Sequence, residues 1–424
     1  MLTDMLFGLF GLTVLVGIAV LFSNNRGAIS WRLVGIGIGL QLLFAVIVIL
    51  TTWGSRFFSF ISTIFVKVIA FTNEGSMFIF GDLADGSKGF YFAFQVLPTI
   101  IFFSSLMSVL YHLGAMQKVV QGMAWVMAKA MRVSGAESIS VAANVFIGQT
   151  EAPLVVRPYV SPMTQSELLT LMVGGMATIA GGVLAAYVGL LGGGDPQLQL
   201  FYAKHLLSAS IMAAPATIVI AKVLVPETET SQTMGEVKVH VEKTASNIID
   251  AAASGAADGL KLALNVAGML LAFIALIAMV NWIFEGIFTE LLGLTIAGEP
   301  ITLQVLIGYA LSPIAWLIGV PWGDSMTIGS LIGQKVIINE FVAYLELSQI
   351  PAGQLSEKAT LIATYALCGF ANFSSIAIQI GGIGGIAPDR RSDLAKFGLR
   401  AVLGGTLATM MTATIAGVLS GIVL

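Results

Sequence analysis

The chain is poor in charge: Asp, Glu, Lys and Arg make up 10% of its 424 residues, against about 25% in an ordinary soluble domain. With 57% hydrophobic residues and a mean hydropathy of +0.93, it holds too few polar side chains to cover the surface of a globule. Its formal net charge of −3 also lacks the basic excess that binds phosphate backbones. These shortages exclude an ordinary cytosolic enzyme, a disordered protein and a nucleic-acid-binding protein, and they predict a polytopic membrane protein.

Cysteine and histidine are also scarce. The single cysteine, Cys368, excludes an intramolecular disulfide framework and a cysteine-rich metal site. The three histidines, His112, His205 and His240, share no spacing that suggests a common metal. The sequence contains neither an HExxH nor a GxSxG motif, so an enzyme acting inside the membrane would lack an evident metal or nucleophile.

Long apolar stretches without charge recur along the chain. A helix needs about 20 apolar residues to cross a bilayer, because its backbone amides must all be satisfied within it. The charge-free stretches run over 5–25, 33–55, 89–117, 168–194, 205–221, 262–284, 300–323, 359–388 and 401–424. We expect about eight full crossings. The first stretch, which Asp4 precedes, is interpreted as a retained helix rather than a cleaved signal peptide.

Basic and aromatic residues indicate how these spans are placed. Lysine and arginine follow the first and third stretches and precede the last, so the positive-inside rule puts both chain ends outside. Segments 55–70 and 118–131 mix aromatic side chains with lysine or arginine and are predicted to lie in the membrane interface. The polar stretch 226–245 is predicted to be a cytoplasmic linker between two halves.

Two segments interrupt the apolar pattern. In 135–165, two arms of about ten residues meet at a polar tip containing Gly148 and Pro153, and each arm is too short to cross. In 303–331 a Gly-Val-Pro break leads into a second short arm, and Glu340 follows it. Paired re-entrant hairpins of this kind are typical of secondary transporters built from inverted repeats, whose site lies between the repeats. The alternative is a pair of ordinary loops beside buried helices.

Two further stretches place polar or glycine residues inside apolar runs. One is Cys368–Ile376, with an asparagine and two serines at mid-span, and the other is Gly174–Gly182. Buried polar groups without partners are unfavourable in a membrane. Each stretch is therefore either a site of close helix packing or an unwound break that coordinates a ligand.

Glu151 and Glu340 are the most informative charges, because a carboxylate at low dielectric must be paired, hydrogen-bonded or protonated. Each could relay a proton, help to bind a cation, or accept hydrogen bonds from a hydroxylated solute. Their neighbours offer amides, hydroxyls and an aromatic ring that suit a neutral polar solute with a planar ring, although a sugar or polar amino acid would also use them. These neighbours are Gln149, Thr150, Phe370, Asn372, Ser374 and Ser375.

Oxygen ligands for a coupling Na⁺ are available beside the expected breaks. Asn144 and Thr178 supply side-chain oxygens close to the breaks at 147–148 and 179–182. Unwound carbonyls commonly complete such sites in transporters. The alternative is that Asn144 simply caps a short helix.

At these residues the chain resembles the concentrative nucleoside transporters, in particular their bacterial branch. The matching motifs are Gly148–Pro153, Gly319–Trp322, Asn339–Tyr344 and Cys368–Ser375, in order across essentially the whole chain. The resemblance implies an all-α protein of about eight transmembrane helices with two re-entrant hairpins, 135–165 and 303–331, and interfacial helices. It also implies a homotrimer in a bacterial inner membrane, whose transport domain carries nucleoside by an elevator motion.

The same resemblance divides the chain into parts. The scaffold would comprise 1–117 together with 246–300, which would hold an interfacial helix and a span. The inverted-repeat transport domain would comprise 118–225 and 301–424.

The resemblance also implies roles for individual residues. Gln149, Thr150 and Glu151 would contact the nucleobase, with Val183 packed against it. The ribose would be held by Glu340, Asn372 and Ser375, with Phe370 beside the site. Sodium would be held by the side chains of Asn144 and Thr178 and the carbonyls of Ile147 and Ile179.

The expected function is therefore import of uridine-like nucleosides with Na⁺, and the expected partners are a nucleoside and the lipid bilayer. A proton-coupled nucleoside symporter is the alternative, since some bacterial relatives couple to protons. An intramembrane enzyme with Glu151 and Glu340 as an acid–base pair ranks lower, as does a passive channel.

Overall fold

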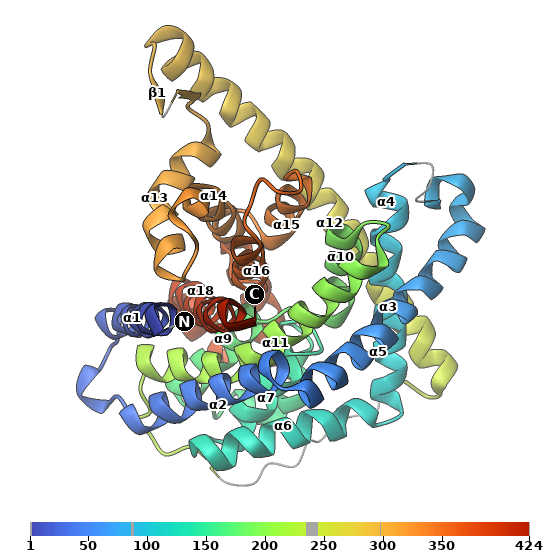
Figure 1. Ribbon diagram of the computed structural model, residues 1–424. Coiled ribbons are helices and arrows are strands. Elements are labelled where there is room, and N and C mark those ends of the chain that lie inside the picture. The colour runs from blue at the N-terminus through green and yellow to red at the C-terminus, as the bar shows by residue number, and fades with distance from the viewer. Residues whose placement is uncertain (1, 86–88, 235–244, 297, 424) are drawn as a thin grey trace.

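Helices make up most of the computed structural model, which describes residues 2–85, 89–234, 245–296 and 298–423 (Figure 1). The first half contains α1 (Leu2–Leu21), η1 (Arg26–Ala28), α2 (Trp31–Leu50), α3 (Thr52–Phe80), η2 (Gly81–Ala84), α4 (Phe92–Gln95), α5 (Leu97–His112), α6 (Ala115–Met131), α7 (Gly135–Asn144), η4 (Ala152–Val156), α8 (Arg157–Val160), α9 (Gln165–Ala177), α10 (Gly181–Gly192) and α11 (Pro196–Leu224). The second half contains α12 (Ile248–Phe284), the π-helical turn η5 (Glu285–Leu291), the paired strands β1 (Thr295–Ile296) and β2 (Glu299–Pro300), α13 (Leu303–Leu317), α14 (Trp322–Ile337), α15 (Glu340–Gln349), α16 (Glu357–Ala366), α17 (Phe373–Ile386), η6 (Pro388–Arg390) and α18 (Arg391–Val423).

Local capping signals set where the central helices begin. Ser134 and Thr164 each accept a bond from the backbone amide three residues later, and the glutamate there accepts one in return, so capping boxes open α7 and α9. Asn339 and Asn372 cap α15 and α17 in a similar way, with the side-chain oxygen accepting from the amide three residues on. The breaks that precede these helices are therefore encoded locally.

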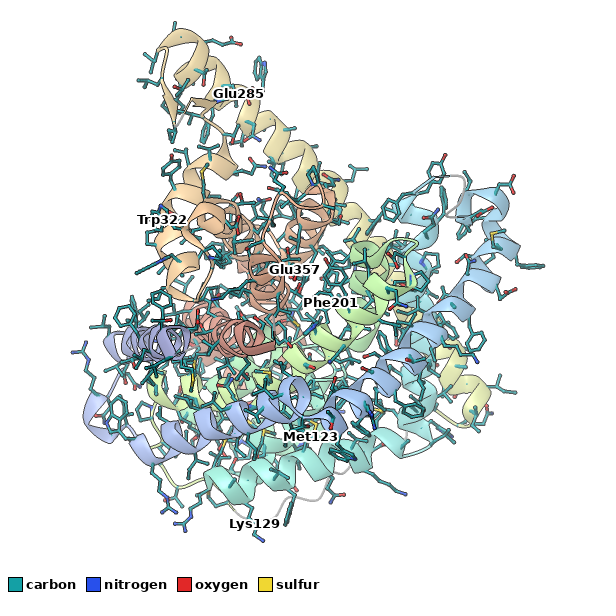
Figure 2. All side chains as sticks on the ribbon, in the orientation of Figure 1. Met123, Lys129, Phe201, Glu285, Trp322 and Glu357 are labelled. Carbon is teal, nitrogen blue, oxygen red and sulfur yellow. The ribbon has the colours of Figure 1, made fainter. Side chains whose placement is uncertain are left out.

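Eight helices within the described residues are long and apolar enough to cross a membrane, and the bent pair α13–α14, which turns by 116°, could add a ninth. This confirms the expected fold class and the expected number of spans. One of the eight includes α3, which runs unbroken through 55–70, where the sequence predicted a shorter interfacial helix. By contrast, α6 is not among the eight. Its Lys129 lies at the outer edge of the molecule (Figure 2), with the ammonium 4.8 Å from the centroid of the Trp125 ring.

Burial separates an inner group of helices from an outer one. In the most apolar windows of α9–α10 and of α11, 89% of the residues are buried, whereas the figure for α12 is 17%. The inner helices α9, α11 and α18 pack against one another, while α12 packs along α5 and projects away from the rest at its β1 end (Figure 1). The apolar outer face of α12 therefore suits lipid or another protein surface.

Two apolar stretches that could have been continuous spans are broken in the structure. The first unwinds at 178–180, between α9 and α10, and the second at 367–372, between α16 and α17. The amide of Phe370 donates to the carbonyl of Thr178 at 3.3 Å, so the two breaks lie side by side. A Cβ at Gly369 would come within 2.8 Å of the Met176 carbonyl oxygen, and this close approach favours glycine there.

The second hairpin is organised differently from the prediction for 303–331. Its helix α14 continues to Ile337, and a further junction at 338–339 leads into α15. Glu340 therefore lies at the α14–α15 junction, beyond the predicted hairpin. The physical reason is the Asn339 cap, which starts a new helix directly beside the acid.

The first part of the expected linker is anchored to the helices. The amide of Gly135 donates to the carbonyl of Thr233 at 2.9 Å, and the Ser231 hydroxyl donates to Glu167 at 2.5 Å. Both Ser231 and Thr233 are buried. Part of 226–234 is thus packed on the helices, while residues 228–230, 232 and 234 are exposed, and 235–244 lie outside the described residues.

Candidate functional site

A buried carboxylate joins the two broken spans. Glu340, the first residue of α15, is 4% exposed. Its Oε1 accepts a bond of 2.9 Å from the hydroxyl of Tyr187 on α10, and its Oε2 accepts one of 3.1 Å from Nδ2 of Asn372. Both oxygens are thereby engaged, as burial of a carboxylate requires.

Asn372 is held rigidly at the start of α17. Its Oδ1 accepts from the Ser375 amide at 2.9 Å and from the Ser374 hydroxyl at 2.7 Å. This cap leaves the Asn372 amide group free to point at Glu340, so its orientation follows from the local fold.

The tip of the first hairpin reaches the same region. Gln149 Nε2 donates to the Ser375 hydroxyl at 3.1 Å, and Gln149 Oε1 accepts from Gln379 at 3.1 Å. Gln379, on α17, also donates to the carbonyl of Met172 at 2.9 Å. A continuous set of polar groups, here called the central network, therefore links both halves of the chain. Its members are Gln149, Tyr187, Glu340, Asn372, Ser375 and Gln379.

Other predicted site residues lie around this network. Val183 is 2% exposed and precedes Tyr187 by four residues on α10, so the two share a helix face. Phe370 is half-buried in the break before α17. Thr150 packs on α17, because a Cβ at Gly382 would lie 2.8 Å from its methyl group.

Glu151 lies apart from the central network. It is exposed, and its carboxylate lies over Gly148 at the tip of the same hairpin. No hydrogen bond among the described residues joins it to Glu340. The structure therefore does not bring the two acids together as a bonded pair.

The predicted ion ligands meet at the ends of two helices. Asn144 is the last residue of α7 and Thr178 follows the last residue of α9. The Thr178 hydroxyl donates to the carbonyl of Gly174 at 2.9 Å, and a Cβ at Gly174 would lie 3.3 Å from Asn144 Nδ2. The amide of Gly181 donates to the carbonyl of Phe146 at 3.0 Å, which ties the α9–α10 break to the hairpin.

An unsatisfied oxygen at this place fits a cation. Asn144 donates through Nδ2 to the carbonyl of Ser140, but its Oδ1 is buried and has no hydrogen-bond donor among the described residues. Buried polar atoms are rarely left unpaired. A hard cation beside this oxygen, the Thr178 hydroxyl and the unwound backbone at Ile147 and Ile179 would satisfy it.

Sequence reasoning missed three residues at the centre: Tyr187, Gln379 and Lys335. Tyr187 carried a weak signal, since it follows Val183 at helical spacing. Gln379 is the one polar side chain in the apolar stretch 376–386, and that isolation is the sequence feature that could have found it. Lys335 follows Gln334 on a helix with several polar residues, so the sequence offers no comparable signal for it.

Family models cover most of the chain. The model described as "Na+ dependent nucleoside transporter N-terminus" matches residues 10–83, and that described as "Na+ dependent nucleoside transporter C-terminus" matches 205–417. Between them, a model described as "Nucleoside recognition" matches 93–194.

Individual relatives agree with these matches. An uncharacterized transporter of Haemophilus influenzae is 48% identical over 99% of each chain. Sodium/nucleoside cotransporter 1 of Mus musculus is 40% identical over 96% of this chain and 63% of its own length. Among solved structures, CNTnw in an inward-facing substrate-bound state is 45% identical, with a TM-score of 0.90, over 99% of this chain and 98% of the other. A variant of CNTnw in an outward-facing state also superposes with a TM-score of 0.90 and 45% identity, over the same shares of the two chains.

Proposed function

The chain belongs to the Na⁺ dependent nucleoside transporter family, and from that premise we propose that it imports uridine-like nucleosides by symport with Na⁺. It is a multi-pass membrane protein and a transporter, not an enzyme, and Na⁺ is its coupling ion. The observation that carries the substrate proposal is the central network. Amide, hydroxyl and carboxylate groups meet there, at the crossing of two broken spans.

The central network suits the two parts of a nucleoside. The Glu340 carboxylate can accept bonds from two adjacent ribose hydroxyls, while the Asn372 amide and Ser375 hydroxyl lie beside it. The Gln149 amide both donates and accepts, which matches the edge of a nucleobase, with Thr150 and Glu151 on the same tip. Val183 and Phe370 supply apolar surface for the ring. These protein–protein bonds would be exchanged for bonds to the solute.

The proposed Na⁺ ligands are the side-chain oxygens of Asn144 and Thr178 and the carbonyls of Ile147 and Ile179. Na⁺ bound there would pair with the unsatisfied Asn144 Oδ1. It would also place a positive charge at the negative, C-terminal end of α7. Asn144 and Gln149 lie on the same hairpin, so ordering the ion ligands also positions the tip that faces the solute.

Replacing Thr178 by Val should raise the Na⁺ concentration for half-maximal uptake by about tenfold, because one oxygen ligand worth about 1.4 kcal/mol is lost without a change of shape. The measurement is initial nucleoside uptake into proteoliposomes as a function of Na⁺. Thr170→Val is a matched control, since Thr170 is also buried on α9 and also bonds a backbone carbonyl, but lies two turns away. An unchanged Na⁺ dependence in Thr178→Val would place the ion elsewhere.

The substrate proposal is tested by competition. Unlabelled nucleosides, free bases and ribose should displace labelled uridine in the order nucleoside, then base or ribose, because only a nucleoside engages both ends of the network. The series is run with and without a Na⁺ gradient. Uptake that is independent of Na⁺ but driven by a pH gradient would support the proton-coupled alternative. Failure to accumulate uridine against its concentration gradient would indicate a channel.

The transport step is proposed to be an elevator motion of the inner helices against a scaffold. Solved relatives in inward- and outward-facing states support alternating access. The pairing of α12 with α5 and the exposed apolar face of α12 support a scaffold that forms a homotrimer, which the mass of the detergent-solubilised particle would test. Placement in a bacterial inner membrane with both ends outside remains part of the proposal.

A further inference from the structure

A lysine lies fully buried near the central network. Lys335, on α14, is 0% exposed and precedes Glu340 by five residues. Its ammonium donates to the carbonyl of Ala366 at 2.8 Å and to the hydroxyl of Thr409 at 3.0 Å. No ion pair holds it within the described part of the chain. Burying a charge without a counter-charge is unfavourable, so the presence of a lysine at this position calls for an explanation.

The ammonium lies at the end of a helix that stops at a break. Ala366 is the last residue of α16, and the unwound segment 367–372 follows it. The last carbonyls of a helix are unsatisfied and carry the negative end of its dipole, about half an elementary charge. Lys335 thus supplies a positive charge where α16 ends and where the backbone turns towards Asn372.

The two halves of the chain repeat one order of elements. The first half has a hairpin (α7 to α8), a broken span (α9 and α10) and a long span (α11). The second half has a helix pair that meets at Asn339 and Glu340 (α14 and α15), a broken span (α16 and α17) and a long span (α18). Asn144 precedes the tip residue Gln149 by five positions, and Lys335 precedes the tip residue Glu340 by the same number.

The corresponding residues face corresponding helix ends. Asn144 lies beside Gly174 in the last turn of α9, and Lys335 bonds the last carbonyl of α16. The first position leaves a buried oxygen unsatisfied, whereas the second holds an ammonium that donates to Ala366 and Thr409.

We propose that the Lys335 ammonium is a tethered cation that occupies, in the second half, the position where the first half binds Na⁺. It acts as a positioning residue: it holds the end of α16 and thereby the break that presents Asn372 and Ser375 to the nucleoside. Because its charge never leaves the protein, only one Na⁺ is transported per nucleoside. This inference rests on the proposed Na⁺–nucleoside symport.

The first measurement uses the unmodified protein in proteoliposomes, with labelled Na⁺ and labelled uridine followed together. The expected ratio is one Na⁺ per uridine, with a Hill coefficient for Na⁺ of one. A ratio of two would overturn the inference whatever the variants do. Absence of any Na⁺-dependent uptake would instead refute the proposed function, so the two failures are distinct.

The second measurement uses two substitutions of Lys335. Lys335→Met keeps the length but removes the charge and both bonds, and we expect the KM for uridine at saturating Na⁺ to rise at least tenfold. Lys335→Asn copies the first half, and we expect uptake to recover as Na⁺ is raised, with a Hill coefficient near two. Lys204→Met is the control, because Lys204 is a half-buried lysine on α11 that bonds Ser55 away from the network.

The results that overturn the inference are specific. An unchanged KM in Lys335→Met removes the positioning role. A Hill coefficient of one in Lys335→Asn, or loss of uptake at every Na⁺ concentration in a variant that elutes as a single folded species, removes the role as a cation substitute. A purely structural lysine would not change the number of Na⁺ ions that drive uptake.

Discussion

Replacing Glu340 by Gln is expected to raise the KM for uridine by about 100-fold or more, since hydrogen bonds to a charged group contribute about 1.5–3 kcal/mol each. The protein's own network should survive the change. Asn372 cannot turn, because its oxygen is held by the α17 cap, but the Tyr187 hydroxyl can rotate to accept from the new amide. The loss therefore falls on the bonds to the ribose. The measurement is initial uridine uptake at saturating Na⁺.

Two further variants test whether the effect on KM comes from the Glu340 charge itself. Tyr187→Phe keeps the carboxylate and removes one donor, so its effect on KM should be smaller. Glu357→Gln changes an exposed glutamate at the start of α16 (Figure 2) and should leave uptake unchanged. If Glu340→Gln transported uridine with the KM of the unmodified protein, Glu340 would not be the ribose contact.

Replacing Lys222 by Met is expected to lower the free energy of unfolding by about 3–5 kcal/mol, the loss seen when one partner of a buried ion pair is removed. The Lys222 ammonium lies 2.8 Å from Glu137 and 3.2 Å from Glu227, and it also donates to the hydroxyl of Ser166. Lys222 and Glu137 are 6% and 1% exposed. The change would leave a buried carboxylate beside the start of α7. The loss of unfolding free energy is measured by denaturant unfolding of the protein in detergent.

A double substitution shows whether the charge is the cause. In Lys222→Met/Glu137→Gln the Glu137 position keeps the oxygen that caps α7 but loses its charge, so part of the stability should return. Lys261→Met, which removes an exposed pair with Asp258, should not change stability measurably. Equal losses in the single and double variants would contradict an electrostatic cause.

The spans and breaks were predictable because their signals are local. A run of about 20 apolar residues marks a span, and asparagine or glycine at a junction marks a cap or break, as at Asn372. The α3 helix is longer than the predicted segment 55–70, because the charges Arg56, Lys67 and Glu74 interrupt the apolar pattern without ending the helix. In the structure all three side chains are exposed on one continuous helix, which tolerates charge there.

The centre of the site was less predictable because it depends on contacts distant in sequence. Tyr187 and Glu340 are 153 positions apart, and Gln149 and Gln379 are 230 apart. No local pattern pairs them. Glu151 is exposed although Gln149, two residues earlier on the same tip, is buried, and nothing in the sequence around them distinguishes the two.

The bond from the Phe370 amide to the Thr178 carbonyl has a consequence for energy conversion. One end belongs to the loop beside the proposed ion ligands, and the other to the loop that presents Asn372. In the proposed symport this bond would connect the two loops, so that Na⁺ bound beside the first would favour the solute-binding arrangement of the second. We therefore expect little Na⁺ to enter without nucleoside.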